Sequence, residues 1–514
     1  MTDPSNQLTP PDSVTATKDN QVSSVSASTR ALNCSEVLYI IGDSFFFECR
    51  SLVGRWTSKQ NVEHLLSFMQ VSRLWHKVFH PILWSHSDAI KIRRFTSEAV
   101  SINSHHLKYL RQGDMDLTPF RCTQLVLLEL TKAGGEGKSE IEMKRRLVQS
   151  NLDLEILLLD GFGQDDLRVE DFVRLTKLQE LTLRNWANKG IPMSKIIRPM
   201  ADTLRVLDLD CIHEFAIHDP TDAGKSLSAS MTLPHLTELR VDKNPTGNDP
   251  LISPRLLQDL VKLTPALKSL KLTVYEDEGD AAYTSLAECL RSTCPLLDDV
   301  EVYWTFPPDE PTALATFLRK CSYAGLVRLY INQGPWSDDL LSAIISHART
   351  LKSLYLHWDR LLFGPEDDLF GAYFVLGLLL ACRHLKYLGI TDVSPNCRGI
   401  FDVLDSHTWG CSQLEEIEFC LGLWRIGDDD PEDCEYAGRD DEIQKISKTN
   451  PIMGWYRPYD LGSPQIFPQV LRRLLELSDT RKHVTTLTYN YQTLVRPGEN
   501  SALLQINTAP DNRM

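Results

Sequence analysis

A six-residue pattern, Leu-x-x-Leu-x-Leu, recurs along most of this chain and restricts what the chain can fold into. Six copies carry leucine at all three positions: 125–130, 154–159, 178–183, 204–209, 267–272 and 351–356. Six further copies substitute Val, Ile or an aromatic residue: 236–241, 297–302, 326–331, 385–390, 414–419 and 484–489. Successive copies start 24 to 34 residues apart, except that the last follows a gap of 70. A pattern repeated at this period indicates a repeat protein.

The spacing within each copy is typical of a β-strand. Successive side chains of a strand point to opposite faces, so the last two apolar positions share one face. A single strand cannot bury that row, whereas parallel strands stacked beside it close a continuous core. Parallel neighbours need crossovers, and the segments between copies have helical apolar spacing, including 165–176, 253–261, 309–321 and 337–349.

The pattern resembles the leucine-rich-repeat family, in its form with longer, helix-bearing repeats, over about Leu125 to Tyr489. The resemblance implies an α/β fold, a solenoid or horseshoe of parallel strands with helical crossovers. The asparagine that often follows the motif in that family is mostly missing, and the repeat spacing is uneven. We therefore expect an irregular solenoid.

Composition excludes several classes of function. A net charge of −15 argues against general nucleic-acid binding, which needs Lys and Arg to neutralise phosphates. The twelve cysteines include no Cys-x-x-Cys pair, which argues against a zinc site or disulfide framework and favours a reducing compartment. Residues 1–30 lack the apolar run of a secretory signal, and the most apolar stretch, 372–382, is too short to span a bilayer. These features predict a soluble cytoplasmic or nuclear protein without a membrane partner.

The chain divides into five parts by composition. Residues 1–30 are polar and predicted to be disordered, and residues 31–84 form a helical unit. Residues 85–123 are expected to connect this unit, partly through helix, to repeats over 124–492, which include a mobile acidic insert at 427–442. Residues 493–514 are expected to be a loose tail.

The helical unit carries a second family pattern. Residues 31–41 and 61–79 have helical apolar spacing, and the second segment is predicted to end before Pro81. Val71 to Trp84 contains Val-Ser-Arg-x-Trp, then Pro and a closing Leu-Trp, and is similar to the second half of an F-box. Ser35-Glu36-Val37-Leu38 with Ile41 resembles its opening helix. Ser35 stands where that family usually has proline, and residues 49–61 form a longer, more polar link than is usual.

This resemblance implies a partner and a function. F-box proteins dock onto the Skp adaptor of SCF ubiquitin ligases, which bridges to a cullin and its RING subunit, and they hold the target protein. The residues that would dock onto or support the adaptor contact are Ser35, Glu36, Val37, Leu38, Ile41, Leu65, Met69, Val71, Trp75 and Trp84. An alternative is that residues 31–84 cap the open end of the solenoid, as repeat arrays require. The chain would then be an interaction scaffold with a degenerate F-box and no ligase role.

The third, fifth and seventh positions of each repeat should share the exposed face of the sheet. Four consecutive repeats place a tyrosine there, with an arginine and a histidine nearby, which is the composition of an interaction hot spot. The predicted target-binding residues are Tyr303, Arg328, Tyr330, Tyr355, His357 and Tyr387. The alternative is that strand-favouring tyrosines simply cover the sheet.

No residue pattern predicts catalysis or a cofactor. Gly137-Lys138-Ser139 matches the tail of a Walker A motif, but Lys132 stands where the first glycine belongs. His105 and His106 lack companions at metal-ligand spacing, and the acidic insert lacks the alternating ligands of a calcium loop. We expect a noncatalytic protein without a metal or cofactor, and a nucleotide hydrolase is a distant alternative.

Overall fold

The computed structural model describes a large part of the chain. The described residues are 32, 34–47, 65–88, 95–112, 120–132, 137–187, 192–212, 231–242, 253–274, 279–304, 312–332, 337–357, 368–393, 409–421, 486–489, 492–495 and 505–508. The predicted disordered segment 1–30 and the acidic insert 427–442 lie outside them, as does most of the glycine-rich turn that precedes Lys138.

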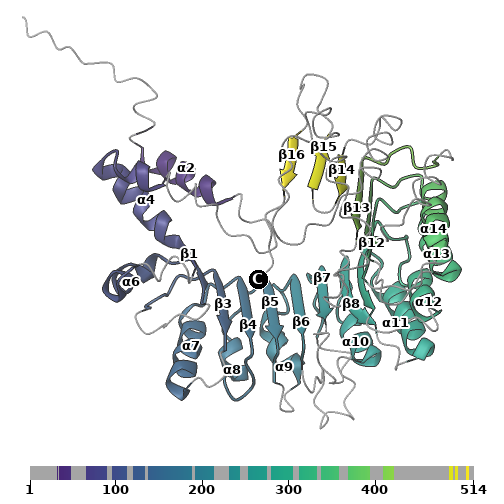
Figure 1. Ribbon diagram of the computed structural model, residues 1–514. Coiled ribbons are helices and arrows are strands. Elements are labelled where there is room, and N and C mark those ends of the chain that lie inside the picture. The colour runs from purple at the N-terminus through teal and green to yellow at the C-terminus, as the bar shows by residue number, and fades with distance from the viewer. Residues whose placement is uncertain are drawn as a thin grey trace, which may run out of the picture.

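The strands form one sixteen-stranded sheet in which spatial order follows chain order. Neighbours from β1 to β14 pair parallel, whereas β14, β15 and β16 pair antiparallel. Figure 1 shows the sheet curving into an arc. The strands are β1 His86–Asp88, β2 Tyr109–Arg111, β3 Leu127–Thr131, β4 Ile156–Asp160, β5 Glu180–Arg184, β6 Val206–Asp210, β7 Glu238–Asp242, β8 Ser269–Val274, β9 Asp299–Trp304, β10 Arg328–Asn332, β11 Ser353–His357, β12 Tyr387–Val393, β13 Glu416–Leu421, β14 Thr486–Tyr489, β15 Gln492–Val495 and β16 Gln505–Thr508.

Helices cover the outer side of the arc (Figure 1). They are α6 Ser97–Asn103, η2 Ser104–His106, α7 Lys138–Ser150, α8 Val169–Phe172, α9 Met193–Ile197, η3 Arg198–Met200, α10 Pro254–Val261, α11 Gly279–Thr293, α12 Thr312–Lys320, α13 Asp338–Ile345 and α14 Asp368–Ala381. Ser253 and Ser337 cap α10 and α13 by accepting a backbone hydrogen bond three residues on. None of the helices in the described residues is long and apolar enough to cross a membrane.

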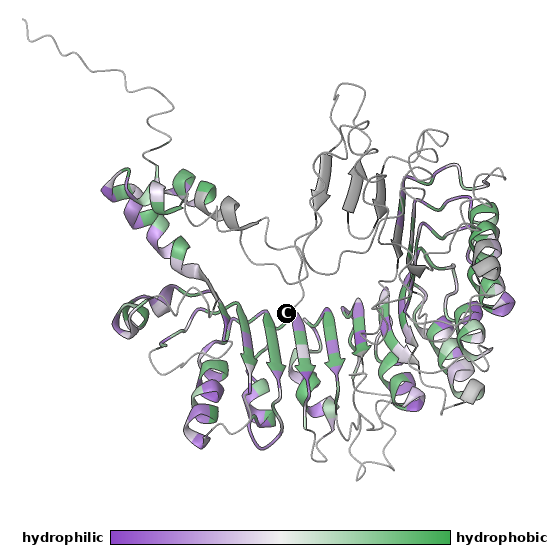
Figure 2. Ribbon diagram, in the orientation of Figure 1, coloured by the Kyte–Doolittle hydropathy of each residue, from purple (hydrophilic) through white to green (hydrophobic). Residues whose placement is uncertain are grey.

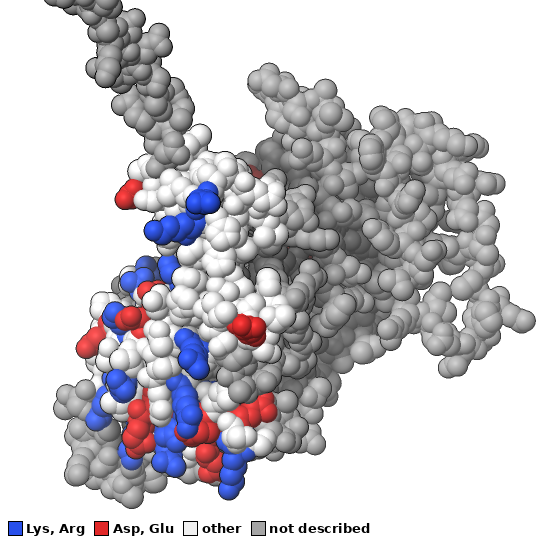
Figure 3. Space-filling model, turned by 90° about the vertical axis from the view of Figure 1, so that its left-hand side faces the viewer, with Lys and Arg blue, Asp and Glu red and all other residues white. Residues whose placement is uncertain are grey.

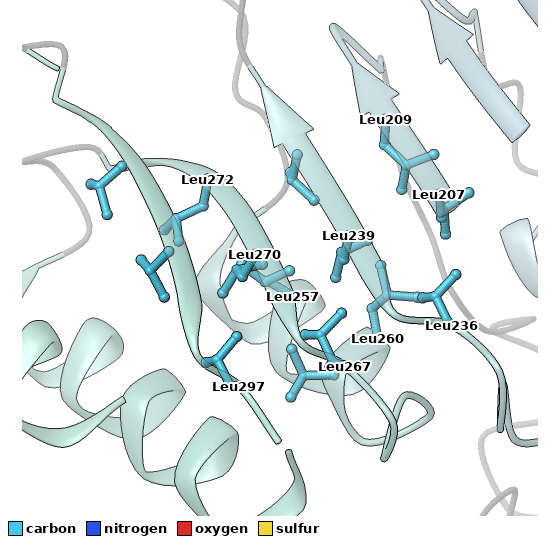
Figure 4. Packing of buried hydrophobic residues seen from close by; sticks show 14 of the residues in the cluster. Leu207, Leu209, Leu236, Leu239, Leu257, Leu260, Leu267, Leu270, Leu272 and Leu297 are labelled. Carbon is cyan, nitrogen blue, oxygen red and sulfur yellow. The ribbon is translucent and has the colours of Figure 1, made fainter. Parts of the chain in front are cut away.

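The core lies between the sheet and these helices. The second and fourth residues of β3, β4, β10 and β11 are buried while their neighbours are only partly covered, so one leucine row per strand faces inward. Figure 4 shows this packing, with Leu257 and Leu260 of α10 against Leu239 and Leu270 of adjacent strands. Figure 2 shows apolar residues concentrated along the sheet and on parts of the helices. The predicted leucine-rich-repeat solenoid is therefore confirmed.

The sheet extends further at both ends than the sequence pattern indicates. Strands β1 and β2 lie in the segment that we expected to be a connector. Leu107 and Leu110 are fully buried like other repeat leucines, but Gln112, 2% exposed, replaces the third. Strands β15 and β16 fall largely in the predicted C-terminal tail, where they continue the sheet by antiparallel pairing.

Several of the turns that lead into a strand contribute one more buried position, three residues before the first leucine of a motif. Asn151, Thr264, Cys294, Cys382 and Cys411 occupy it and are fully buried. Their carbonyl oxygens accept a hydrogen bond from the N–H of the leucine three residues later, at 3.1–3.4 Å. The hydrogen bond therefore fixes how these chain segments enter the sheet, and polar, thiol and leucine side chains all occupy the position, since Leu175 and Leu233 are fully buried there as well.

The N-terminal unit consists of α2 Ser35–Phe47, a helical segment at 65–69, and α4 Arg73–Ser85. The expected single helix over 61–79 is broken at residues 70–72, where the Ser72 hydroxyl accepts the N–H of Trp75 and begins α4. This helix also continues through Pro81. Pro81 costs one backbone hydrogen bond, but continuation buries Ile82 and Trp84.

Candidate interaction surfaces

A shallow open groove of about 510 Å³ runs along the N-terminal unit between α2 and α4. Its lining is mostly apolar and consists of Ser35, Glu36, Tyr39, Ile40, Lys77, Val78 and Pro81. Ile40 is 68% exposed and Tyr39 is 43% exposed. Figure 3, which looks onto this end of the molecule, shows few charged side chains over the upper, N-terminal part and many of both signs below it.

The structure separates the predicted adaptor-binding residues into exposed and buried sets. Ser35 and Glu36 line the groove, and Val71 is exposed at the turn before α4. Val37, Ile41, Met69 and Trp75 are half-buried. Leu38 and Leu65 are fully buried in a small core with Phe79 and Ile82, so they support the groove instead of lining it.

Trp75 and Trp84 hold the unit together and join it to the repeats. The Trp75 indole donates a 3.0 Å hydrogen bond to the Leu32 carbonyl, and its ring packs edge-on against Phe68 and Phe79. Trp84 is 5% exposed and belongs to the solenoid core, so of the two predicted roles it can only support the adaptor contact and not line it. Burial of this large side chain makes the helical unit continuous with the first repeat.

The sequence analysis did not identify Tyr39 and Ile40, which lie exposed in the groove. Tyr39 and Ile40 follow the buried Leu38, and Ile40 lies one helical turn after Glu36. Helical spacing could have placed Ile40 beside Glu36, because residues four apart share a face. Ser35 is the first residue of α2 and not its cap, because the carbonyl of Cys34 accepts the N–H of Leu38. Hydrogen bonds from Cys34 and Ser35 hold the pKa of Glu36 below its usual value.

Four histidines lie where this unit meets the first repeats. The rings of His76 and His80 on α4 stack at 5.3 Å, and His80 lies 6.1 Å from His106 of η2, which contacts His105 at 3.8 Å. Burial, reinforced by the neighbouring histidines, lowers the pKa of both His80 and His106. Within the described ranges no group of three or more His, Cys, Asp or Glu is placed to hold a metal ion.

The four predicted tyrosines lie on the concave face along a diagonal. Tyr330 and Tyr355 are register neighbours on β10 and β11, and their rings stack at 4.6 Å with an angle of 4°. Tyr303 lies one row toward the carboxyl ends of the strands, 5.9 Å from Tyr330. Tyr387 lies one row the other way, opposite Ser353. The tyrosines therefore cross the sheet obliquely.

Gly389 makes room for this arrangement. It pairs with Tyr355 across β11 and β12, and a Cβ at Gly389 would lie 2.3 Å from the Tyr355 ring and 2.7 Å from the Tyr387 hydroxyl. The Tyr355 ring therefore leans over the glycine, and the Tyr387 hydroxyl donates a short hydrogen bond to Glu418. Burial raises the pKa of Tyr330 and Tyr387, so both hydroxyls stay protonated at neutral pH.

The predicted charged neighbours occupy this face as well. Arg328, on β10, forms an ion pair with Asp299 at 2.9 Å, and its side chain remains 61% exposed. His357 is half-buried at the end of β11 and pairs in register with Asn332. The structure thus brings Tyr303, Tyr330 and Tyr355 into direct contact and places Arg328, His357 and Tyr387 at the edges of that cluster.

The repeats and their leucine rows define a leucine-rich-repeat solenoid with a helical unit at its N-terminal end. No family model and no curated protein matches the sequence. Similar solved structures include the Rad7 and Elc1 complex of yeast, at 14% identity and a TM-score of 0.40, covering 77% of this chain and 89% of that chain. The leucine-rich repeat-containing protein LegL7 from Legionella pneumophila has 12% identity and a TM-score of 0.33, covering 61% and 89%.

Proposed function

We propose that this chain is a noncatalytic substrate receptor of an SCF-type ubiquitin ligase. The N-terminal helical unit would dock onto the Skp adaptor, which brings the cullin and RING subunits, and the concave face of the repeats would hold the target protein. The F-box-like residues at 35–41 and 71–84 support the choice of adaptor. No cofactor belongs to this proposal.

The observation that carries the proposal is the apolar groove between α2 and α4. Exposed Tyr39 and Ile40 sit beside Val78 and Pro81 on a surface with few charges. Contiguous exposed apolar side chains on a protein surface mark interaction sites. The unit is also anchored: the Lys108 ammonium beside β2 donates to the Tyr39 hydroxyl at 3.1 Å, and the Lys108 N–H donates to the Ser85 carbonyl at 3.0 Å.

The cysteines are consistent with a reducing compartment, as proposed for the cytoplasm or nucleus. None of the eight cysteines that the structure describes forms a disulfide bond. Burial raises the pKa of Cys122 and Cys321 to about 12 and that of Cys382 to about 11. Such thiols stay protonated and behave as small apolar core residues.

Replacing Ile40 with aspartate should weaken adaptor binding about thirtyfold, because a charge would be buried at the centre of the contact. Ile40 is 68% exposed in the free protein, so the substitution should leave folding intact. The measurement is titration of the purified full-length chain with a purified Skp-class adaptor, alongside thermal unfolding of each variant.

Ile102→Asp is the matched control, because Ile102 on α6 is 61% exposed and lies outside the groove. It should bind the adaptor like the wild type. Equal measurable affinity in all three proteins would place the adaptor contact outside the groove, and no measurable binding by the wild type would favour the interaction scaffold without a ligase role. Trp75 is a poor probe because its removal would break contacts inside the unit.

A further inference from the structure

We propose that the concave face binds an extended, basic segment of the target, laid across the strands from β5 to β13. The inference rests on the proposed function in one respect, that the concave face is where the target is held. It adds the chemical class of the recognised segment, which is a chain that carries Lys or Arg and packs planar guanidinium or peptide groups on the tyrosine rings.

The concave face carries more negative than positive side chains. Register pairing places the third, fifth and seventh motif positions of neighbouring repeats in continuous rows on the concave face. Among the described side chains of β2 to β13 these rows carry ten carboxylates: Glu129, Asp160, Glu180, Asp208, Asp210, Glu238, Asp299, Glu301, Glu416 and Glu418. They carry five cationic side chains: Arg111, Arg184, Arg240, Lys271 and Arg328. The face is acidic by a ratio of two to one.

All five cations are already paired within the face, and Arg240 also reaches a second carboxylate, Asp208, at 3.7 Å. Their partners are respectively Glu129 at 2.8 Å, Asp210 at 4.0 Å, Glu238 at 2.5 Å, Glu301 at 3.6 Å and Asp299 at 2.9 Å. Asp160 accepts a hydrogen bond from the Asn185 amide, and the rest of the surplus negative charge lies at two places. One is Glu180 with Asp208 on β5 and β6, and the other is Glu416 with Glu418 on β13.

The carboxylates at both places are only partly compensated: Arg240 reaches Asp208 at 3.7 Å, and Glu418 accepts a hydrogen bond from the Tyr387 hydroxyl. Burial raises the pKa of Glu180 and of Asp208, in spite of the nearby Arg240 guanidinium. Burial and the neighbouring Glu418 raise the pKa of Glu416, and no described cation acts against that shift. A partner's ammonium or guanidinium group would relieve both the desolvation and the repulsion.

The tyrosine diagonal lies between the two acidic places. The Lys271 ammonium already lies 4.6 Å from the centre of the Tyr303 ring, so these rings accept a cation in the native structure. Tyr330 and Tyr355 present a stacked pair of rings, on whose exposed edges a guanidinium or peptide plane can pack. Aromatic side chains flanked by carboxylates recognise arginine better than they recognise an acidic or purely apolar chain.

The distance between the two acidic places fixes the length of the segment. Eight strand spacings separate β5 from β13, and at about 4.8 Å each they cover about 40 Å. An extended chain of about twelve residues reaches that far. The proposal therefore predicts a segment of roughly that length, with basic residues toward both ends.

The test uses the full-length chain and a fluorescent twelve-residue peptide of alternating arginine and glycine, followed by anisotropy at about 150 mM salt. We expect saturable binding, weakened at least tenfold by Glu416→Gln with Glu418→Gln and similarly by Tyr330→Ala with Tyr355→Ala. Gly389→Ala should also weaken it, because the added Cβ would push the Tyr355 ring from its place. Thermal unfolding checks that each variant is folded.

The control removes two carboxylates from the helical side, Glu98→Gln with Glu170→Gln, which are exposed on α6 and α8. It should bind the arginine peptide within twofold of the wild type, and a glutamate–glycine peptide should not bind. An equal loss in this control, equal binding of the acidic peptide, or no binding of the arginine peptide to the wild type would overturn the inference. Ile40→Asp should bind the peptide normally, which separates this result from adaptor docking.

Discussion

Replacing Asn151 with leucine should lower the free energy of unfolding by about 4 kcal/mol. The Asn151 side chain is fully buried in the turn between α7 and β4. Its Oδ1 accepts the Leu125 N–H at 2.8 Å, and its Nδ2 donates to the carbonyls of Leu147 at 2.7 Å and Cys122 at 3.1 Å. A leucine would leave the Leu125 N–H buried without a partner and the two carbonyls with only the single Ser150 hydroxyl, 3.3–3.4 Å away, to share. Each lost partner costs about 1–3 kcal/mol, offset in part by the greater apolarity of leucine.

The shape of a leucine is not the obstacle. Leu175 and Leu233 occupy the equivalent positions before the next motifs and are fully buried. The expected loss therefore comes from hydrogen bonds that span two repeats, between the segment entering β3 and the end of α7. Removing them should open the N-terminal repeats first, because a repeat array can unfold locally.

The measurement is urea unfolding followed by circular dichroism, with hydrogen exchange over residues 120–160 to locate the change. Asn103→Leu is the matched control, since the Asn103 amide makes one hydrogen bond, to the Ala99 carbonyl at 2.8 Å, and is only part-buried. It should cost about 1 kcal/mol or less. Equal midpoints for the two variants would show that the Asn151 contacts contribute little.

The sequence predicted the repeats well because leucine spacing reports the two faces of a strand directly. It failed at the ends of the sheet for an equally local reason. In the β2 repeat Gln112 takes the place of the third leucine, and β15 and β16 pair antiparallel, for which the parallel repeat pattern carries no signal. The buried turn position was also missed, since Asn151, Thr264 and Cys294 share a backbone geometry and not a residue type.

The candidate surfaces were predicted in part. The tyrosines were placed on the correct face, and their positions within the motif, seventh in one repeat, fifth in two and third in the last, already encode the diagonal. Which residues of the helical unit stay exposed depended on how α2 packs against α4. Leu38 against Phe79 sets that rotation, and it turns Ile40 outward. Such a contact between distant segments leaves no local signature in the sequence.

Lowering the pH should destabilise the repeats through His347, and replacing His347 with leucine should remove that dependence. His347 is 4% exposed between two repeats. Its Nδ1 accepts the Leu326 N–H at 3.2 Å, so Nε2 carries the proton that is donated to the Leu318 carbonyl at 2.7 Å. If Nδ1 also bound a proton, it could no longer accept the Leu326 N–H, and two N–H groups would point at each other.

Burial lowers the pKa of His347 below its ordinary value, against a smaller opposing effect of the Leu318 carbonyl. The unfolded chain therefore binds a proton at this residue more readily than the folded chain does. The stabilisation is present above the unfolded pKa of about 6.5, and it falls as the pH drops from there toward the lower folded pKa. Stability should thus decrease between about pH 7 and pH 5 in the wild type.

His347→Leu should cost about 3 kcal/mol at pH 7.5, because the Leu326 N–H and the Leu318 carbonyl lose their partners. The free energy of unfolding of this variant should fall less steeply on acidification than that of the wild type. The difference in free energy of unfolding between the two proteins should therefore become smaller toward pH 5. Urea unfolding midpoints of both proteins at several pH values measure this difference. Subtracting one protein from the other at each pH removes the contribution of the other groups that titrate in this pH range. His384→Gln, at an exposed position, should track the wild type throughout. A difference in free energy of unfolding that stays constant with pH would contradict a neutral His347 that hydrogen-bonds to Leu326 and Leu318. The interface between those repeats would then be stabilised by packing alone.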